Sequence, residues 1–207
     1  QFEHDACGVG FVAHIKGQQS RQIIDNAREV LLNMTHRGAV GSDKNSGDGA
    51  GILTTLPQEF LEKVAASDLG ITLPPRGTYS AGIVFLPQDE PHRDECIATV
   101  ERIVAEEGQR VLGWRDVPRD NSMIGPTALE SEPVMKQLFV GAGDGTTSEH
   151  FERMLYVIRK RATHALHGSE HDPHAAFYIC SLSVRVIVYK GMLMPEQLFE
   201  YFTDLGA

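Results

Sequence analysis

Two strand-like segments that follow each other almost without a gap place the strongest constraint on the fold of this chain. FYICSLS (177–183) and RVIVYKG (185–191) are rich in β-branched and aromatic residues, and only Val184 separates them. Parallel neighbours need a crossover of roughly a dozen residues or more, whereas antiparallel neighbours do not. The sequence therefore predicts antiparallel pairing here and argues against a strictly alternating, parallel α/β fold.

Helix-like and strand-like patterns alternate irregularly along the rest of the chain. Apolar residues spaced three and four apart predict helices at 20–34, 57–66, 91–108, 149–166 and 195–202. Short apolar runs bounded by turn residues predict strands at 7–15, 51–56, 79–86, 110–117 and 134–140. Helices packed on antiparallel sheets give an α+β layered arrangement, and at 207 residues we expect a single domain.

Charge and hydropathy argue against two classes of protein. The formal net charge is -9, whereas a nucleic-acid-binding protein normally carries a basic face. No segment approaches the roughly 20 apolar residues that span a bilayer, and no secretory signal is visible. We therefore expect neither a nucleic-acid partner nor a membrane partner.

The spacing of cysteines and histidines argues against a metal site. Cys7, Cys96 and Cys180 are too few and too scattered for a disulfide framework, and no CxxC pair occurs. Four histidines cluster in ATHALHGSEHDPHA (162–175), without the HExxH spacing of a helical zinc site. We expect this cluster to form a solvated loop and no metal to be bound.

Cys7 has two interpretations. As a small residue on the first strand it would be a buried structural cysteine. As a nucleophile it needs a base, because a free thiol is mostly protonated at neutral pH, and neither His4 nor His14 forms a recognisable signature with it. If the bond between Ala6 and Cys7 were cut, the new α-amine, with a pKa of about 8, could accept the thiol proton itself.

The turn-rich stretch THRGAVGSDKNSGDGAG holds two further candidates. Arg37 follows an amphipathic helix, so it is either a solvated cation at the helix end or a brace for the nucleophile loop. Asp48 lies between two glycines and either forms a turn or orients that loop. These glycines match neither a P-loop nor a dinucleotide-binding pattern. Trp114 in LGWRDV is expected to anchor a strand against a helix.

Six segments of the chain follow the order and spacing of a known family: EHDACGVGF, MTHRGAVGSD, SGDGAGIL, LGWRDVPRDNS, FERMLYVIRKR and FYICSLSVRVIVYKGML. They resemble the class II glutamine amidotransferases, and more specifically the amidotransferase domain at the head of the glutamate synthase large chain. The resemblance covers essentially the whole chain. The last two segments discriminate most, because other class II amidotransferases lack them.

The resemblance implies an N-terminal nucleophile hydrolase fold, a four-layer sandwich with two antiparallel sheets between helix layers. It implies hydrolysis of L-glutamine to glutamate and ammonia, with Cys7 as the nucleophile that forms a γ-glutamyl thioester. The α-amine of Cys7 would be the general acid/base. Arg37, Gly38 and Asp48 would support the active site or bind substrate.

In the full family enzyme, ammonia would pass to a second site where 2-oxoglutarate is aminated and reduced. FMN and an iron–sulfur cluster are implied for that site, and no cofactor is expected in this chain. The implied partners are the remaining synthase domains of the same polypeptide and either an FAD/NAD(P)H-binding small subunit or ferredoxin. The expected location is the cytoplasm, or the plastid stroma in a photosynthetic eukaryote.

Two features depart from the family pattern. QFEHDA (1–6) precedes Cys7, and we expect it to be a leader ahead of an amidotransferase domain at 7–207. The chain stops before the Asn-Gly pair of the family's oxyanion hole, so we expect the fold to be incomplete at the C-terminus and this chain alone to be nearly inactive. Two alternatives stay open: a class II amidotransferase serving another synthetase, and a non-catalytic module that is precursor-locked or truncated.

Overall fold

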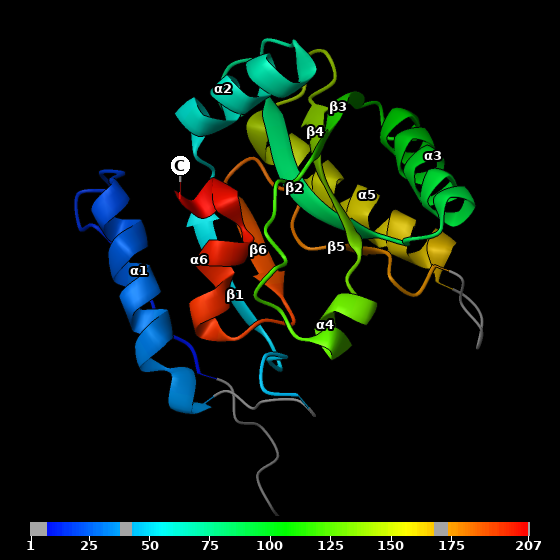
Figure 1. Ribbon diagram of the computed structural model, residues 1–207. Coiled ribbons are helices and arrows are strands. Elements are labelled where there is room, and N and C mark those ends of the chain that lie inside the picture. Colours follow the sequence, from blue (N-terminus) through cyan, green and yellow to red (C-terminus); the bar gives the residue numbers. More distant parts are fainter. Residues whose placement is uncertain (1–7, 38–42, 168–173, 207) are drawn as a thin grey trace, which may run out of the picture. The chain divides into compact units, whose positions relative to one another are not determined.

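The computed structural model describes residues 8–37, 43–167 and 174–206 (Figure 1). The chain divides into two compact units. The first unit comprises Gln1–Ile52, Pro118–Glu132 and Tyr189–Ala207, and the second comprises Leu53–Val117 and Pro133–Val188. None of the described helices combines the length and the apolar character needed to cross a membrane.

The second unit is built on a four-stranded antiparallel sheet in the order β3-β4-β2-β5. Its strands are β2 (Tyr79–Leu86), β3 (Arg110–Asp116), β4 (Val134–Gly141) and β5 (Tyr178–Ile179). β2 pairs with β4 along its whole length, from Tyr79 opposite Gly141 to Leu86 opposite Val134. Both β2 and β4 are almost wholly buried, as expected of strands at the centre of a sheet.

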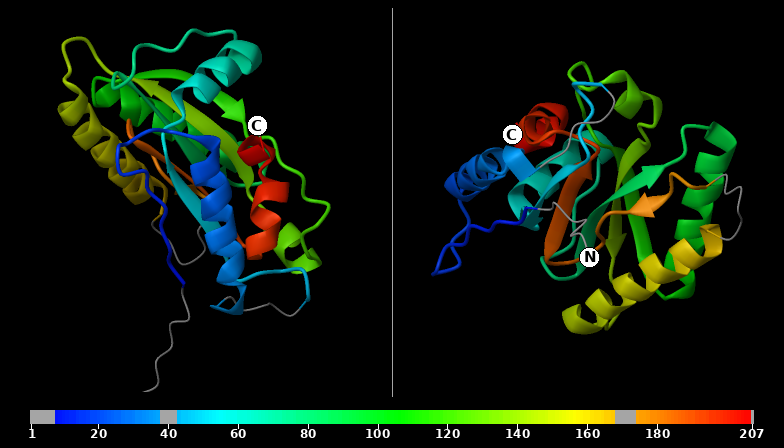
Figure 2. Two further views of the ribbon diagram at one scale, coloured as in Figure 1. Left: turned by 90° about the vertical axis from the view of Figure 1, so that its left-hand side faces the viewer. Right: turned by 90° about the horizontal axis from the view of Figure 1, so that it is seen from below.

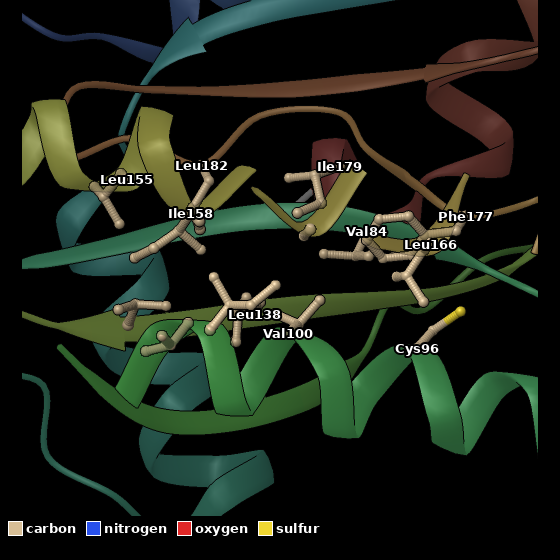
Figure 3. Close-up of a cluster of buried hydrophobic side chains, with 14 of the residues drawn as sticks. Val84, Cys96, Val100, Leu138, Leu155, Ile158, Leu166, Phe177, Ile179 and Leu182 are labelled. Carbon is tan, nitrogen blue, oxygen red and sulfur yellow. The ribbon is translucent and has the colours of Figure 1, made fainter. Parts of the chain in front are cut away.

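Two long helices cover one face of this sheet. The helices of the second unit are α2 (Gln58–Leu69), α3 (Glu90–Glu106) and α5 (Ser148–Leu166). α3 and α5 lie side by side (Figure 1, Figure 2), and Figure 3 shows their apolar side chains meeting those of the strands. Val100 of α3 and Ile158 of α5 pack in one buried cluster with Val84 of β2 and Leu138 of β4. Burying a side chain of this size contributes about 1.5–3 kcal/mol relative to leaving it exposed.

Trp114 confirms the expectation that it anchors a strand to a helix. Its indole N–H donates to the carboxylate of Glu101 on α3 at 3.0 Å, and its ring packs against the buried cluster. Cys96 and Cys180 are both buried within the second unit. They behave as small apolar residues, as cysteines in protein interiors commonly do.

The first unit contains short helical elements. They are α1 (Arg21–Asn33), η1 (Thr35–Arg37), α4 (Pro126–Glu130), η2 (Pro195–Gln197), α6 (Leu198–Tyr201) and η3 (Thr203–Gly206). α1 and α6 lie beside each other (Figure 2), with the guanidinium carbon of Arg28 5.6 Å from the ring centre of Phe199. A cation over an aromatic ring at this separation is attractive.

The second sheet has two strands, β1 (Ala50–Thr55) and β6 (Val186–Gly191). Gly51 lies directly against Lys190, and the amide N–H of Leu56 donates to the carbonyl of Arg185 at 2.7 Å, so the strands run antiparallel. Two antiparallel sheets with helices confirm the predicted α+β class.

The expectation that 177–183 and 185–191 pair with each other is wrong. β5 joins β2 in one sheet, and β6 joins β1 in the other. The hydroxyl of Ser183 accepts from the amide of Arg185 at 3.0 Å, which turns the chain before a hairpin can form. Glu152 on α5 accepts from the Ser183 hydroxyl at 2.7 Å and from the amide of Val184 at 2.8 Å. Side chains thus satisfy backbone groups that a hairpin would have paired.

We predict that Glu152→Ala lowers the free energy of unfolding by about 1–3 kcal/mol, because it leaves the amide of Val184 without its acceptor. Glu152→Gln keeps an acceptor oxygen and is expected to lose less. Urea unfolding measures both. Glu149, in the first turn of the same helix and exposed, provides the matched control as Glu149→Ala. Equal losses in Glu152→Ala and Glu149→Ala would contradict the role given to Glu152.

Candidate active site

The nucleophile predicted from the sequence, Cys7, lies outside the described residues. The segment that follows it, 8–14, forms no strand in the described structure, so the predicted strand at 7–15 is wrong there. Gly10 packs directly on α1, where a Cβ would come within 2.4 Å of Cγ1 of Val30, while Val9 and Phe11 are exposed. The segment that follows Cys7 is therefore held by a close contact between Gly10 and α1, and not by strand pairing.

Arg37 is the last residue of η1, directly after α1. The Thr35 hydroxyl donates to the carbonyl of Leu32 at 2.7 Å, and Nδ1 of His36 lies 3.0 Å from the carbonyl of Asn33. Polar side chains commonly bind helix-terminal carbonyls in this way, and they end the helix here. The side chain of Arg37, and all of Gly38, lie outside what the structure describes, so their roles stay predictions.

The glycine-rich loop, residues 43–49, is held by a carboxylate at its start. Asp43 accepts hydrogen bonds from the hydroxyl of Ser46 at 2.8 Å and from the amides of Asn45 at 3.1 Å and Thr127 at 3.3 Å. The hydroxyl of Ser46 in turn accepts from the amide of Ala128 at 3.1 Å. Asp43 and Ser46 thus cap the first turn of α4, which ties the loop to a segment some 80 residues away in the sequence. Hydrogen bonds from Thr127 and Ser46 hold the pKa of Asp43 below its usual value.

The second half of the loop contains Asp48 between two constrained glycines. Gly47 is buried, and a Cβ there would lie 2.4 Å from the carbonyl carbon and oxygen of Leu193. Gly49 has φ +144°, a conformation that other residues rarely adopt. Asp48 itself is exposed at a bend between them. Its side chain is available to a ligand or a neighbouring segment, and both the turn role and the orienting role stay predictions.

A buried carboxylate joins other parts of the first unit. Glu132, whose side chain is 10% exposed, accepts from Nε of Arg119 and Nδ2 of Asn121, each at 2.9 Å, and from the Tyr201 hydroxyl. Burial raises the pKa of Glu132, but hydrogen bonds from Tyr201 and Asn121 and the charge of Arg119 outweigh it, so the pKa lies below the usual value. Burial and the Glu132 carboxylate both raise the pKa of Tyr201. This network fastens the segment 118–132 to α6.

The loop predicted for the histidine cluster is wrong for His164, which lies in the last turn of α5, and His167 caps that helix. Nε2 of His174 lies 3.0 Å from a carboxylate oxygen of Glu95, and Nε2 of His167 lies 3.0 Å from the carbonyl of Phe177. His171 lies outside the described residues. Within the described ranges, no group of three or more His, Cys, Asp or Glu side chains is placed to hold a metal ion.

Sequence reasoning missed Asp43, Ser46 and Glu132. The role of Asp43 could have been predicted from the local sequence. Aspartate side chains commonly accept from the amide two residues later and form a turn, as Asp43 does with Asn45. The contacts of Glu132 with Tyr201 have no such signal, because 69 residues separate them.

Gly47→Ala is expected to reduce the free energy of unfolding by about 1–3 kcal/mol, since the added methyl group collides with the backbone of Leu193. The matched control is Gly206→Ala in the same unit, where nothing lies within 4 Å of the added carbon. It should change stability by less than about 0.5 kcal/mol. Chemical denaturation followed by circular dichroism compares them. Similar losses in both variants would show that Gly47 is not packed as described.

Asp43 also predicts a dependence of stability on pH. Its pKa is depressed in the folded chain, so its stabilising contribution is present above its unfolded pKa of about 3.9 and is lost as pH falls through the folded value. Asp43→Asn removes this contribution, so the variant should be less stable at pH 7 and lose less stability on acidification. Urea midpoints from pH 7 to pH 3 test this expectation. Parallel pH profiles for the two proteins would refute it.

Comparison with known proteins adds a second line of evidence. The family model described as "Glutamine amidotransferases class-II" matches residues 7–207. The chain is 45% identical, over 99% of its length, to "Glutamate synthase [NADH]" of Schizosaccharomyces pombe, and 42% identical over 99% to "Glutamate synthase [NADPH] large chain" of Bacillus subtilis. It is 40% identical over 98% to "Ferredoxin-dependent glutamate synthase, chloroplastic" of Oryza sativa subsp. japonica.

The chain spans only about a tenth of these relatives, covering 10%, 13% and 12% of their respective lengths. Within that part, the family match begins at Cys7 and includes the glycine-rich loop and both sheets. The sequence motifs, the two antiparallel sheets and this match agree with one another. The chain therefore belongs to the class II glutamine amidotransferases, which have the N-terminal nucleophile hydrolase fold.

Proposed function

We propose that residues 7–207 belong to the glutamine-hydrolysing domain of a glutamate synthase and that residues 1–6 are a leader. The observation that carries this proposal is the family match, which starts at Cys7 rather than at the first residue. Similarity to three glutamate synthases over 98–99% of the chain supports the choice among class II enzymes.

In the proposed reaction, the Cys7 thiolate attacks the side-chain amide carbon of L-glutamine. The carbon–sulfur bond forms, the carbon–nitrogen bond breaks, and the leaving nitrogen takes a proton and departs as ammonia. Water then attacks the γ-glutamyl thioester, which releases glutamate and restores the thiol. No oxidant or reductant is needed, since both steps are acyl transfers.

The base in this proposal is the α-amine of Cys7, which exists only after the bond to Ala6 is cut. An α-amine has a pKa of about 8, so a useful fraction is neutral at physiological pH and can accept the thiol proton. Arg37 and Gly38 would support the nucleophile from the end of η1. Asp48 would do so from the glycine-rich loop, where its exposed carboxylate is held between two constrained glycines.

The released ammonia would serve the reductive amination of 2-oxoglutarate elsewhere in the polypeptide. FMN and an iron–sulfur cluster would supply the electron transfer for that step. This chain does not fit the cluster, since it has three cysteines and two of them, Cys96 and Cys180, are buried in the second unit. The other synthase domains would therefore hold both groups. The electron donor would reach them through an FAD/NAD(P)H-binding small subunit or through ferredoxin.

Cys7→Ala in the full-length protein tests the nucleophile. Glutamine-dependent ammonia release should fall by at least about 1,000-fold, because no other group replaces the attacking sulfur. Glutamate formation from added ammonia should persist, because the second reaction does not use Cys7. Cys180→Ala is the matched control, which is expected to lose stability but keep glutaminase activity.

Two measurements on the wild-type protein separate the alternatives. Intact mass should show a mature chain that begins at Cys7, and 6-diazo-5-oxo-norleucine should label that residue. A mature chain that keeps Gln1 and is not labelled would favour the non-catalytic module. Labelling without any glutamate formation from 2-oxoglutarate would favour an amidotransferase that serves another synthetase.

A further inference from the structure

Gln197 occupies a central position in the first unit. Its side chain is 3% exposed, and its amide makes three hydrogen bonds. Nε2 donates to the carbonyls of Asn45 at 3.0 Å and Met123 at 2.8 Å, and Oε1 accepts from the amide of Met194 at 2.8 Å. The Gln197 side chain therefore joins η2 to the glycine-rich loop, 152 residues earlier in the sequence, and to the segment at Met123, 74 residues earlier.

Backbone contacts also hold the glycine-rich loop near Asn45. The carbonyl of Asn45 also accepts from the amide of Gly125 at 3.0 Å, so it is shared between Gln197 and a second segment. On the other side of Asn45, Gly47 packs against the backbone of Leu193. The loop is thus held at Asn45 by Gln197 and Gly125, and at Gly47 by the backbone of Leu193.

We propose that Gln197 is a positioning residue for the amidotransferase reaction. The loop that it holds follows the predicted active-site residue Gly38 in the sequence and contains another, Asp48. Because Asn45 is held in place, the loop residues before and after it can adopt fewer positions. A displacement of about 1 Å by a remote change can cost about 100-fold in rate. This inference rests on the proposed function of Cys7.

The chemistry of an amide explains why glutamine suits this position. Two carbonyl oxygens need donors and one backbone amide needs an acceptor, and a primary amide offers both from one end. A glutamate would direct a carboxylate at the carbonyls of Asn45 and Met123. A methionine would fill the space but remove the donor to the carbonyl of Met123 and the acceptor of the Met194 amide, and it would leave the carbonyl of Asn45 with the Gly125 amide alone.

Gln109 provides a matched control inside the same chain. It is also buried, at 6% exposure, and its amide likewise donates to a carbonyl, that of Glu107, and accepts from an amide, that of Gly143, each at 2.8 Å. It belongs to the second unit, away from the glycine-rich loop in sequence. Loss of its hydrogen bonds should therefore affect stability without affecting the loop.

The test compares Gln197→Met and Gln109→Met in the full-length protein. Both should lower the melting temperature. Only Gln197→Met should lower kcat/KM for glutamine and the rate of Cys7 labelling by 6-diazo-5-oxo-norleucine, each by about 10- to 100-fold. Glutamate formation from added ammonia should be unchanged in both variants. Labelling of Gln197→Met at the wild-type rate would overturn the proposal, because Gln197 would then only stabilise the fold.

Failure of the proposed function would look different, since the wild-type protein itself would then not be labelled at Cys7. That result would overturn both proposals, whereas normal labelling of wild type and of Gln197→Met would overturn only this one.

Gln197→Glu gives a second test if the methionine variant does not fold. Burial against two carbonyl oxygens raises the pKa of the introduced carboxyl, and its neutral form can donate to one of them. The labelling deficit relative to wild type should therefore shrink as pH falls. The charged side chains next to Asn45, Asp43 and the exposed Lys44, are the same in both proteins, so the ratio of the two rates isolates the effect of the introduced carboxyl. A ratio that stays constant with pH would count against the positioning role.

Discussion

The hydrogen bonds of Glu152 determine how this chain passes from one sheet to the other. This carboxylate on α5 accepts from the Val184 amide, a backbone group that a hairpin could otherwise pair, and from the Ser183 hydroxyl. β6 is then directed to β1 instead of β5. The turn held by Glu152 thus lies between the last strand of one sheet and the last strand of the other. The general constraint is that backbone polar groups removed from water need partners.

The two units differ in the interactions that hold their segments together. The second unit packs two amphipathic helices on a sheet and buries a continuous apolar cluster (Figure 3). In the first unit, α1 contributes no fully buried side chain. Its irregular segments are held by polar side chains, of which Asp43, Glu132 and Gln197 each join two or more segments. A loop held by directional hydrogen bonds adopts a defined geometry.

Sequence patterns predicted helices and strands that are defined by residues close together in the sequence. The strand at 79–86 has the predicted bounds, and the helix predicted at 149–166 begins one residue earlier, at Ser148. Partners distant in sequence left no pattern, so the separation of β5 and β6 and the contacts of Gln197 could not be foreseen. For the candidate site, motif resemblance predicts Cys7, Arg37, Gly38 and Asp48. It did not reveal how the glycine-rich loop is held, because Gln197 binds backbone carbonyls, which every residue type carries, at positions distant in the sequence.

Trp114 has a practical consequence. It is the one tryptophan in the sequence, and its indole is bound to Glu101 within the second unit. Its fluorescence therefore responds to separation of β3 from α3 and carries no direct signal from the glycine-rich loop. Tyrosines such as Tyr189 and Tyr201 are the aromatic reporters of the first unit, and Tyr201 donates to a carboxylate. The other three tyrosines, Tyr79, Tyr156 and Tyr178, lie in the second unit, so a tyrosine signal mixes the two units. Selective excitation of the indole, in contrast, follows the melting of the second unit without any added label.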